Sequence, residues 1–163
     1  MGSENTWMFK SIAMLSLLGY ISLPDSLLNK ISSGRILTHD QELEYLKHSE
    51  VGYKLISEIP RLEEIAQVIK FQNKHYDGSG FPSDDLSGKD IPMGARILKI
   101  ALDYERFSNI TYSNEGALLQ LEEHVERYDP KILKLFIKST SIFRTENIIT
   151  VSLVELEEGM KIY

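Results

Sequence analysis

The sequence predicts an all-α fold, a helical bundle that ends in a short β-hairpin or strand extension. Apolar residues recur at three- and four-residue spacing through most of the 163 residues, which is the pattern of amphipathic helices. Residues 147–156 read NIITVSLVEL, and this β-branched, partly alternating segment favours a strand. We therefore assign one helical domain to residues 4–140 and a strand extension to residues 146–163.

The first predicted helices are short and closely spaced. Residues 7–18, WMFKSIAMLSLL, are apolar on every face, which is typical of a buried helix, and Gly19 is a suitable end for it. LPDSLLNK, residues 23–30, predicts a second helix because a proline and an aspartate suit its first turn. Thr38 is a candidate N-cap for one or two helices that reach Ser57.

The later helices have the same apolar rhythm. Each begins with a polar residue or a proline, and we expect them within residues 61–75, 92–107, 114–128 and 129–139. The strand extension that follows is too short to be stable alone. We expect it to pack on the helices, to pair with another chain, or to continue in a longer protein.

Composition excludes several classes of protein. A hydrophobic content of 42% in 163 residues is enough for one ordinary core. The net charge of -6 argues against a nucleic-acid or membrane-surface binder. The absence of cysteine excludes disulfides and thiolate metal sites. Because no apolar run reaches the roughly 20 residues of a membrane span, and no signal-peptide pattern opens the chain, we expect a cytoplasmic protein.

The segment NKHYDGSGFP, residues 73–82, is too specific for an ordinary connection. Asp77, Gly78 and Gly80 can close a tight loop, because aspartate bonds its own backbone and glycine accepts positive φ. Phe81 and Pro82 stand beside them, and an exposed ring on a rigid loop is a common contact point. The loop is therefore either a structural closure or a partner-docking surface.

Three segments in order resemble the HD-GYP family, the bacterial signalling branch of the HD superfamily of metal-dependent phosphohydrolases. They are LPDSLLNK, LKHSEVGYKL and HYDGSGFPSDDLSGKDIPMGARIL. The likeness covers residues 9–107, and residues 77–98 match the family pattern DGxGYPxGLxGxxIPxxARI, with Phe81 in place of tyrosine. The resemblance implies a helical HD-domain-like bundle that hydrolyses cyclic di-GMP, often as the output domain of a response regulator.

The resemblance also implies a cluster of two or three metal ions, which would turn a bound water into hydroxide. Of the six ligand positions that it assigns, His48 alone keeps a ligand type. The others carry Ser16, Leu17, Gln72, Asn73 and Leu102. In addition, Tyr20 replaces a lysine and Lys74 replaces a glutamate of the family. Hydroxyl, amide and hydrocarbon groups cannot hold such a cluster.

We therefore expect a catalytically inactive domain without a cofactor. Lys74 would oppose cation binding near the former site by charge repulsion. Leu17 and Leu102 suggest that hydrocarbon has filled the former metal cavity. His48 fits a core or helix-surface residue better than a ligand, and His39, His75 and His124 fit surface positions.

The expected role is in signal transduction within a two-component system, as a response-regulator output that acts by protein contacts. Its expected partners are other signalling proteins, such as GGDEF-type or receiver domains, and a homodimer is also open. The loop of Asp77, Gly78, Gly80, Phe81 and Pro82 is the candidate docking surface.

Two alternatives remain open at this stage. In the first, a phosphodiesterase survives with a rearranged metal site built from His48, His75, Asp77 and Asp103. In the second, the domain binds cyclic di-GMP without hydrolysing it.

The second alternative rests on two basic residues. Arg96 and Lys99 are three residues apart, so they share a helix face and could hold two phosphates. Arg96 could instead pair with Asp77 or Asp90 and fix the loop, which is the role that we favour.

Overall fold

The computed structural model describes residues 2–140, and the predicted strand extension over 146–163 lies outside them. Of the described residues, 2–129 form one compact unit and 130–140 belong to a second. Residues 130–140 of that second unit are helical, as the sequence predicted.

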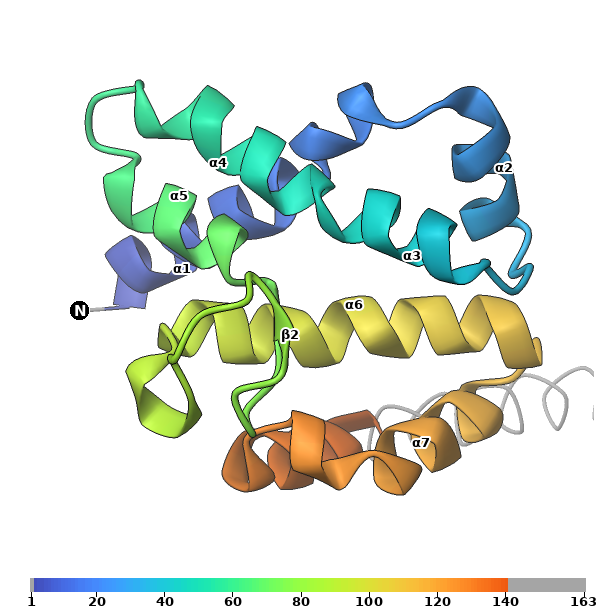
Figure 1. Ribbon diagram of the computed structural model, residues 1–163. Helices are drawn as coiled ribbons and strands as arrows, with labels where there is room; N and C mark the ends of the chain where they lie inside the picture. The colour runs from blue at the N-terminus through green and yellow to red at the C-terminus, as the bar shows by residue number, and fades with distance from the viewer. Residues whose placement is uncertain (1, 141–163) are drawn as a thin grey trace, which may run out of the picture. The chain divides into compact units, whose positions relative to one another are not determined.

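The first unit is built from helices, short 3-10 turns and one small hairpin (Figure 1). The α-helices are α1 Gly2–Leu15, α2 Asp25–Ser32, α3 His39–Leu46, α4 His48–Ser57, α5 Glu63–Lys70, α6 Met93–Thr111 and α7 Asn114–Glu123. The 3-10 turns are η1 Leu18–Ser22, η2 Gly88–Asp90 and η3 Val125–Arg127, and the strands are β1 Asn73–Lys74 and β2 Gly80–Phe81. The predicted all-α class is confirmed.

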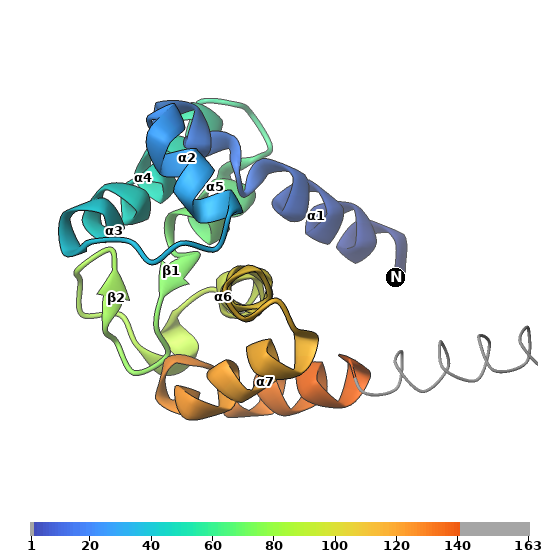
Figure 2. The ribbon, with the colours of Figure 1, turned by 90° about the vertical axis from the view of Figure 1, so that its right-hand side faces the viewer.

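Helix α6 is the element around which the others are arranged. It packs against α7 on one side and against α1 and α5 on the other, and the end-on view of α6 in Figure 2 shows this arrangement. The core between these helices includes Ile12 of α1, Ile65 and Ile69 of α5, and Ala95 and Leu98 of α6, all at most 7% exposed. This packing follows the apolar rhythm of the three segments.

Capping residues set some of the boundaries as expected. Thr38 accepts a hydrogen bond from the Gln41 backbone N–H, and the Gln41 side chain accepts one from the Thr38 N–H, which completes a capping box. The segment that follows forms two helices, α3 and α4, on either side of Lys47. The first helix ends at Leu15, three residues earlier than predicted.

The prediction of a helix through residue 75 was wrong, because α5 ends at Lys70 and the chain turns into a hairpin. Asn73 pairs with Phe81 and Lys74 with Gly80 in antiparallel register. Gly80 has φ +82, and a Cβ there would lie 2.5 Å from the Asn73 carbonyl oxygen. Only glycine therefore suits this close approach.

Lys74 has a different role from the one expected. Its side chain is fully buried, and its Nζ donates to the carbonyl oxygens of Pro82 at 2.9 Å and Asp84 at 2.7 Å. It also pairs with the Asp84 carboxylate at 2.9 Å. The charge is thus neutralised inside the hairpin loop, where three oxygens surround it, so it holds the loop closed.

Gly19 determines how closely η1 approaches α4. A Cβ at this position would collide with the His48 carbonyl oxygen and lie 3.1 Å from the Gly52 nitrogen. Both obstacles are backbone atoms that cannot rotate away. The close approach of Gly19 to the α4 backbone therefore holds η1 against the start of α4.

We predict that Gly19→Ala destabilises the fold by at least about 2 kcal/mol, because η1 and α4 must separate to admit one methyl group. Urea unfolding followed by circular dichroism measures the change. Ile21→Ala in the same 3-10 turn is the control, because Ile21 is 80% exposed. A Gly19→Ala midpoint equal to that of the control would refute the close contact.

Candidate functional site

Three of the six positions that the resemblance assigns to metal ligands meet in the interior. Ser16 follows α1, His48 opens α4, and Gln72 lies between α5 and β1, and their exposed fractions are 3%, 1% and 0%. Gln72 Nε2 donates to the Ser16 carbonyl oxygen at 3.1 Å and to His48 Nε2 at 2.9 Å. We call this arrangement of Ser16, His48 and Gln72 the Gln72 bridge.

The bridge defines the protonation state of His48. A carbonyl oxygen can only accept, so the contact between His48 Nδ1 and the Tyr45 carbonyl oxygen requires a proton on Nδ1. His48 Nε2 then carries the lone pair that accepts from the Gln72 amide. Burial lowers the pKa of His48, which favours this neutral form. The one nitrogen that could bind a metal ion is therefore already occupied.

Aromatic rings surround the His48 imidazole. The Tyr20 ring meets it edge-on, with centroids 4.7 Å apart and planes at 86°, and the Tyr45 ring lies 4.9 Å away. Tyr20 occupies the position to which the resemblance assigns a lysine. Burial raises the pKa of Tyr45 well above its ordinary value, so this ring carries no charge near neutral pH.

Leu17 and Leu102, at two of the positions that the resemblance assigns to ligands, line a cavity of about 330 Å³ beside the bridge. We call it the apolar cavity, and its full lining is Leu17, Tyr20, Leu28, Asn29, Ile31, Ser32, Tyr45, Leu102, Glu105, Arg106 and Asn109. Leu17 is 41% exposed. The two leucines form walls of this cavity, and the filling of a former metal cavity by hydrocarbon stays a prediction.

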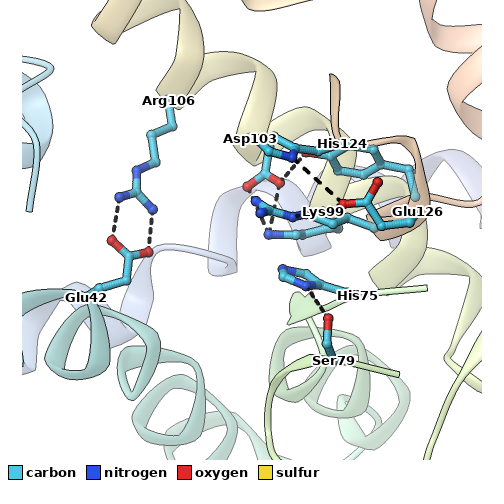
Figure 3. Close-up of polar contacts among 10 residues, drawn as sticks. Glu42, His75, Ser79, Lys99, Asp103, Arg106, His124 and Glu126 are labelled. Carbon is cyan, nitrogen blue, oxygen red and sulfur yellow. Dashed lines mark hydrogen bonds and ion pairs between the residues drawn. The ribbon is translucent and has the colours of Figure 1, made fainter. Parts of the chain in front are cut away.

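A second cavity, of about 400 Å³, has a different character. We call it the charged cavity, and its lining is Glu42, Tyr45, Leu46, Asn73, His75, Gly80, Lys99, Asp103, Arg106, Phe107, Ile110 and Arg127. Figure 3 shows several of these side chains together, with Arg106 facing Glu42 and Lys99 facing Asp103. Tyr45 and Arg106 line both cavities.

Carboxylates neutralise the basic groups of the charged cavity. Arg106 makes two hydrogen bonds to Glu42, at 2.7 and 2.6 Å. Burial opposes its charge, but the bonds and charge of Glu42 outweigh burial and raise the pKa of Arg106. Lys99 lies 2.9 Å from Asp103, whose other bond comes from the Tyr128 hydroxyl at 2.7 Å. Cations and anions therefore alternate along this side of α6.

Arg96 does not join Lys99 in this cavity. Its Nη1 pairs with Asp129 at 2.6 Å, so Arg96 does pair with a carboxylate, but the partner is neither Asp77 nor Asp90 and the pair does not fix the loop. Asp129 is 33 residues away in sequence and almost buried, at 5% exposure. The ion pair fastens the segment after η3 to the start of α6.

The loop residues are held by local bonds. Asp77 accepts from the Ser79 backbone N–H at 2.8 Å and from its hydroxyl at 2.7 Å, and His75 Nδ1 contacts the same hydroxyl at 2.8 Å. Burial, followed by the charges of Lys99 and Arg127, lowers the pKa of His75 to about 4. Gly78 has φ +93, as a tight loop requires. Phe81 and Pro82 are half-buried, so the ring is less exposed than we expected.

These residues do not fit the metal cluster that the resemblance implies. Among residues 2–140, no three or more histidine, aspartate or glutamate side chains are grouped so that they could hold an ion. Of the rearranged set, His48 is engaged by Gln72, and Asp103 by Lys99 and Tyr128. The Gln72 Oε1 oxygen is buried without a hydrogen-bond partner in the structure, but one oxygen beside hydrocarbon walls makes no cluster.

Sequence reasoning missed three contacts of this region, namely the Gln72 bridge, the Arg106–Glu42 pair and the support of the loop by Lys74. The bridge joins residues 56 positions apart and the ion pair residues 64 apart. No spacing rule connects such residues. A glutamine at a position expected to bear a ligand was the one available signal, since its amide can donate twice.

The fold and the site define a helical domain whose central polar positions are joined by hydrogen bonds. The sequence matches the HD domain family over residues 1–132, and the chain belongs to that family. The HD domain indicates a phosphohydrolase-like superfamily. No curated protein matches the chain. No helix of the described residues is long and apolar enough to cross a membrane.

We predict that Gln72→Met lowers the free energy of unfolding by about 2–4 kcal/mol, because it leaves His48 Nε2 and the Ser16 carbonyl oxygen buried without a donor. Methionine keeps the length of the side chain and removes both donors. Gln67→Met, at an exposed position of α5, is the matched control for the substitution itself. Urea unfolding of both variants measures the difference, and equal losses would contradict the bridge.

Proposed function

We propose that this HD domain does not hydrolyse cyclic di-GMP and acts in bacterial signal transduction by contacts with other proteins. The observation that carries the proposal is the Gln72 bridge. Metal-dependent hydrolysis needs free imidazole and carboxylate donors at neighbouring positions. Here the imidazole of His48 accepts a hydrogen bond from Gln72, and that amide also bonds Ser16.

The apolar cavity supports the same proposal. Leu17 and Leu102 supply walls without any lone pair, so they offer nothing to a cation or to an attacking water. A hydrolytic site has to polarise both the phosphate and the water, usually through metal ions. With leucine at both positions, neither side chain can bind a metal ion that would polarise the phosphate or the water.

The docking surface that we propose is the loop Asp77–Pro82. Lys74 fixes the loop from within, and the bonds of Asp77 and Ser79 fix its tip. Binding to a preformed loop costs less conformational entropy than binding to a mobile one. The partners that suit this role are signalling proteins, with GGDEF-type and receiver domains as the first to test.

A second candidate function is a receptor that binds cyclic di-GMP without hydrolysis. The charged cavity favours it, because Lys99, Arg106 and Arg127 line a space of about 400 Å³. Lys99 pairs with Asp103 and Arg106 pairs with Glu42, so the phosphates of a bound nucleotide would have to displace one of these carboxylates. Arg96, which is tied to Asp129, is not among the lining residues.

We predict that the purified protein contains no stoichiometric iron or manganese and leaves cyclic di-GMP intact after prolonged incubation with either ion. Elemental analysis and chromatography of the nucleotide measure the two outcomes. A metal-replete HD-GYP phosphodiesterase is the positive control. Two bound transition ions together with linear product would overturn the proposal. If titration with cyclic di-GMP released heat but no linear product formed, the result would instead support a receptor that binds the nucleotide without hydrolysis.

Docking on the loop makes a separate prediction. Phe81→Ala should weaken binding to a purified GGDEF-type or receiver partner at least tenfold, since an aromatic contact contributes about 1.4 kcal/mol or more at such an interface. Biolayer interferometry measures the affinity. Ile36→Ala removes an apolar side chain that is 86% exposed and lies outside the loop. Equal effects of the two variants would exclude this loop as the docking surface.

A further inference from the structure

The apolar cavity has the lining of a small-molecule site. Its walls are the aliphatic side chains and rings of Leu17, Tyr20, Leu28, Ile31, Tyr45 and Leu102. Asn29, Ser32, Glu105 and Asn109 also line it, and these residues are exposed, so the polar groups lie toward solvent. Apolar walls with a few polar groups at the opening are typical of pockets that bind organic ligands.

The size of the cavity limits the ligand. Its volume of about 330 Å³ is at the lower end of the roughly 300–1,000 Å³ that is usual for ligand pockets. A molecule of two or three fused or linked rings fits this space, whereas a cyclic dinucleotide is larger. Aromatic ligands suit the walls, because the Tyr20 and Tyr45 rings can meet them edge to face.

The charges around the cavity determine the charge of the ligand. Among the described residues that line it, Arg106 is the one basic group, and Glu42 holds it by two hydrogen bonds. Its guanidinium also lies 5.1 Å from the centre of the Tyr45 ring. An anionic ligand would lack a free cation and would meet the Glu105 carboxylate at the opening, whereas a cationic ligand would lose its hydration against the apolar walls and find that carboxylate only at the exposed rim. The walls therefore favour an uncharged molecule.

We propose that the apolar cavity binds a small, uncharged, largely aromatic molecule between η1, α2 and α6. The polar groups at the opening suit one hydroxyl or carbonyl of such a ligand. The site lies beside the Gln72 bridge, because Tyr20 and Tyr45 line the cavity and also contact His48. This inference does not depend on the docking loop or on the absence of hydrolysis, and its test uses neither.

The test uses N-phenyl-1-naphthylamine, an uncharged aromatic probe whose fluorescence rises in apolar surroundings, and the full chain. Wild-type protein should give a saturable signal with one site per chain. Leu17→Asp should weaken binding at least tenfold, because a carboxylate would replace part of the apolar wall. Leu18→Asp is the matched control: Leu18 is 37% exposed, close to the 41% of Leu17, and does not line the cavity. Its affinity should stay within twofold of wild type.

A second measurement needs no variant. In wild-type protein with labelled methyl groups, the probe should shift the methyl resonances of Leu17, Leu28 and Leu102. The anionic probe 1-anilinonaphthalene-8-sulfonate should not displace it at equal concentration. Absence of saturable binding, equal losses in Leu17→Asp and Leu18→Asp, or shifts centred on the exposed Ile36 and Leu119 would each overturn the proposal.

Discussion

The structure of this site depends on one amide group. Gln72 Nε2 donates both of its protons inside the protein, one to the Ser16 carbonyl oxygen and one to His48 Nε2. Because all three residues are at most 3% exposed, neither acceptor has an adequate substitute in water. The bridge thus joins the end of α1, the start of α4 and the end of α5 without any ion. A metal cluster in a relative would connect the same positions through coordination bonds.

The two cavities share Tyr45 and Arg106 but differ in character. On one side of Tyr45 and Arg106, Leu17 and Leu102 line the apolar cavity. On the other side, Lys99 and Arg106 are balanced by Asp103 and Glu42. An unpaired buried charge would be costly, so these carboxylates stabilise the two cations in the protein interior. The hairpin does not need either cavity for its stability, because the Lys74 ammonium is hydrogen-bonded by carbonyl oxygens of its own loop.

Local patterns predicted the helices well and the site in part. The cap at Thr38 and the apolar rhythm of α6 depend on neighbours within four residues, so the sequence displays them. Positions 16, 48 and 72, which the resemblance assigns to ligands, do lie together, although no ligand role is tested by that. The end of α5 was missed because the burial of Lys74 in the hairpin outweighs helix propensity. The Arg96 partner was missed because Asp129 is brought to it by tertiary packing alone.

The most direct test of the account is the tautomer of His48, which long-range nitrogen–proton correlation spectroscopy measures at neutral pH. A hydrogen bond from the Gln72 amide requires a protonated Nδ1 and an unprotonated Nε2, and this state should be unchanged when stoichiometric Mn²⁺ is added. A protonated Nε2, or selective loss of the His48 signal through bound Mn²⁺, would contradict the claim that hydrogen bonding has replaced metal coordination at this position.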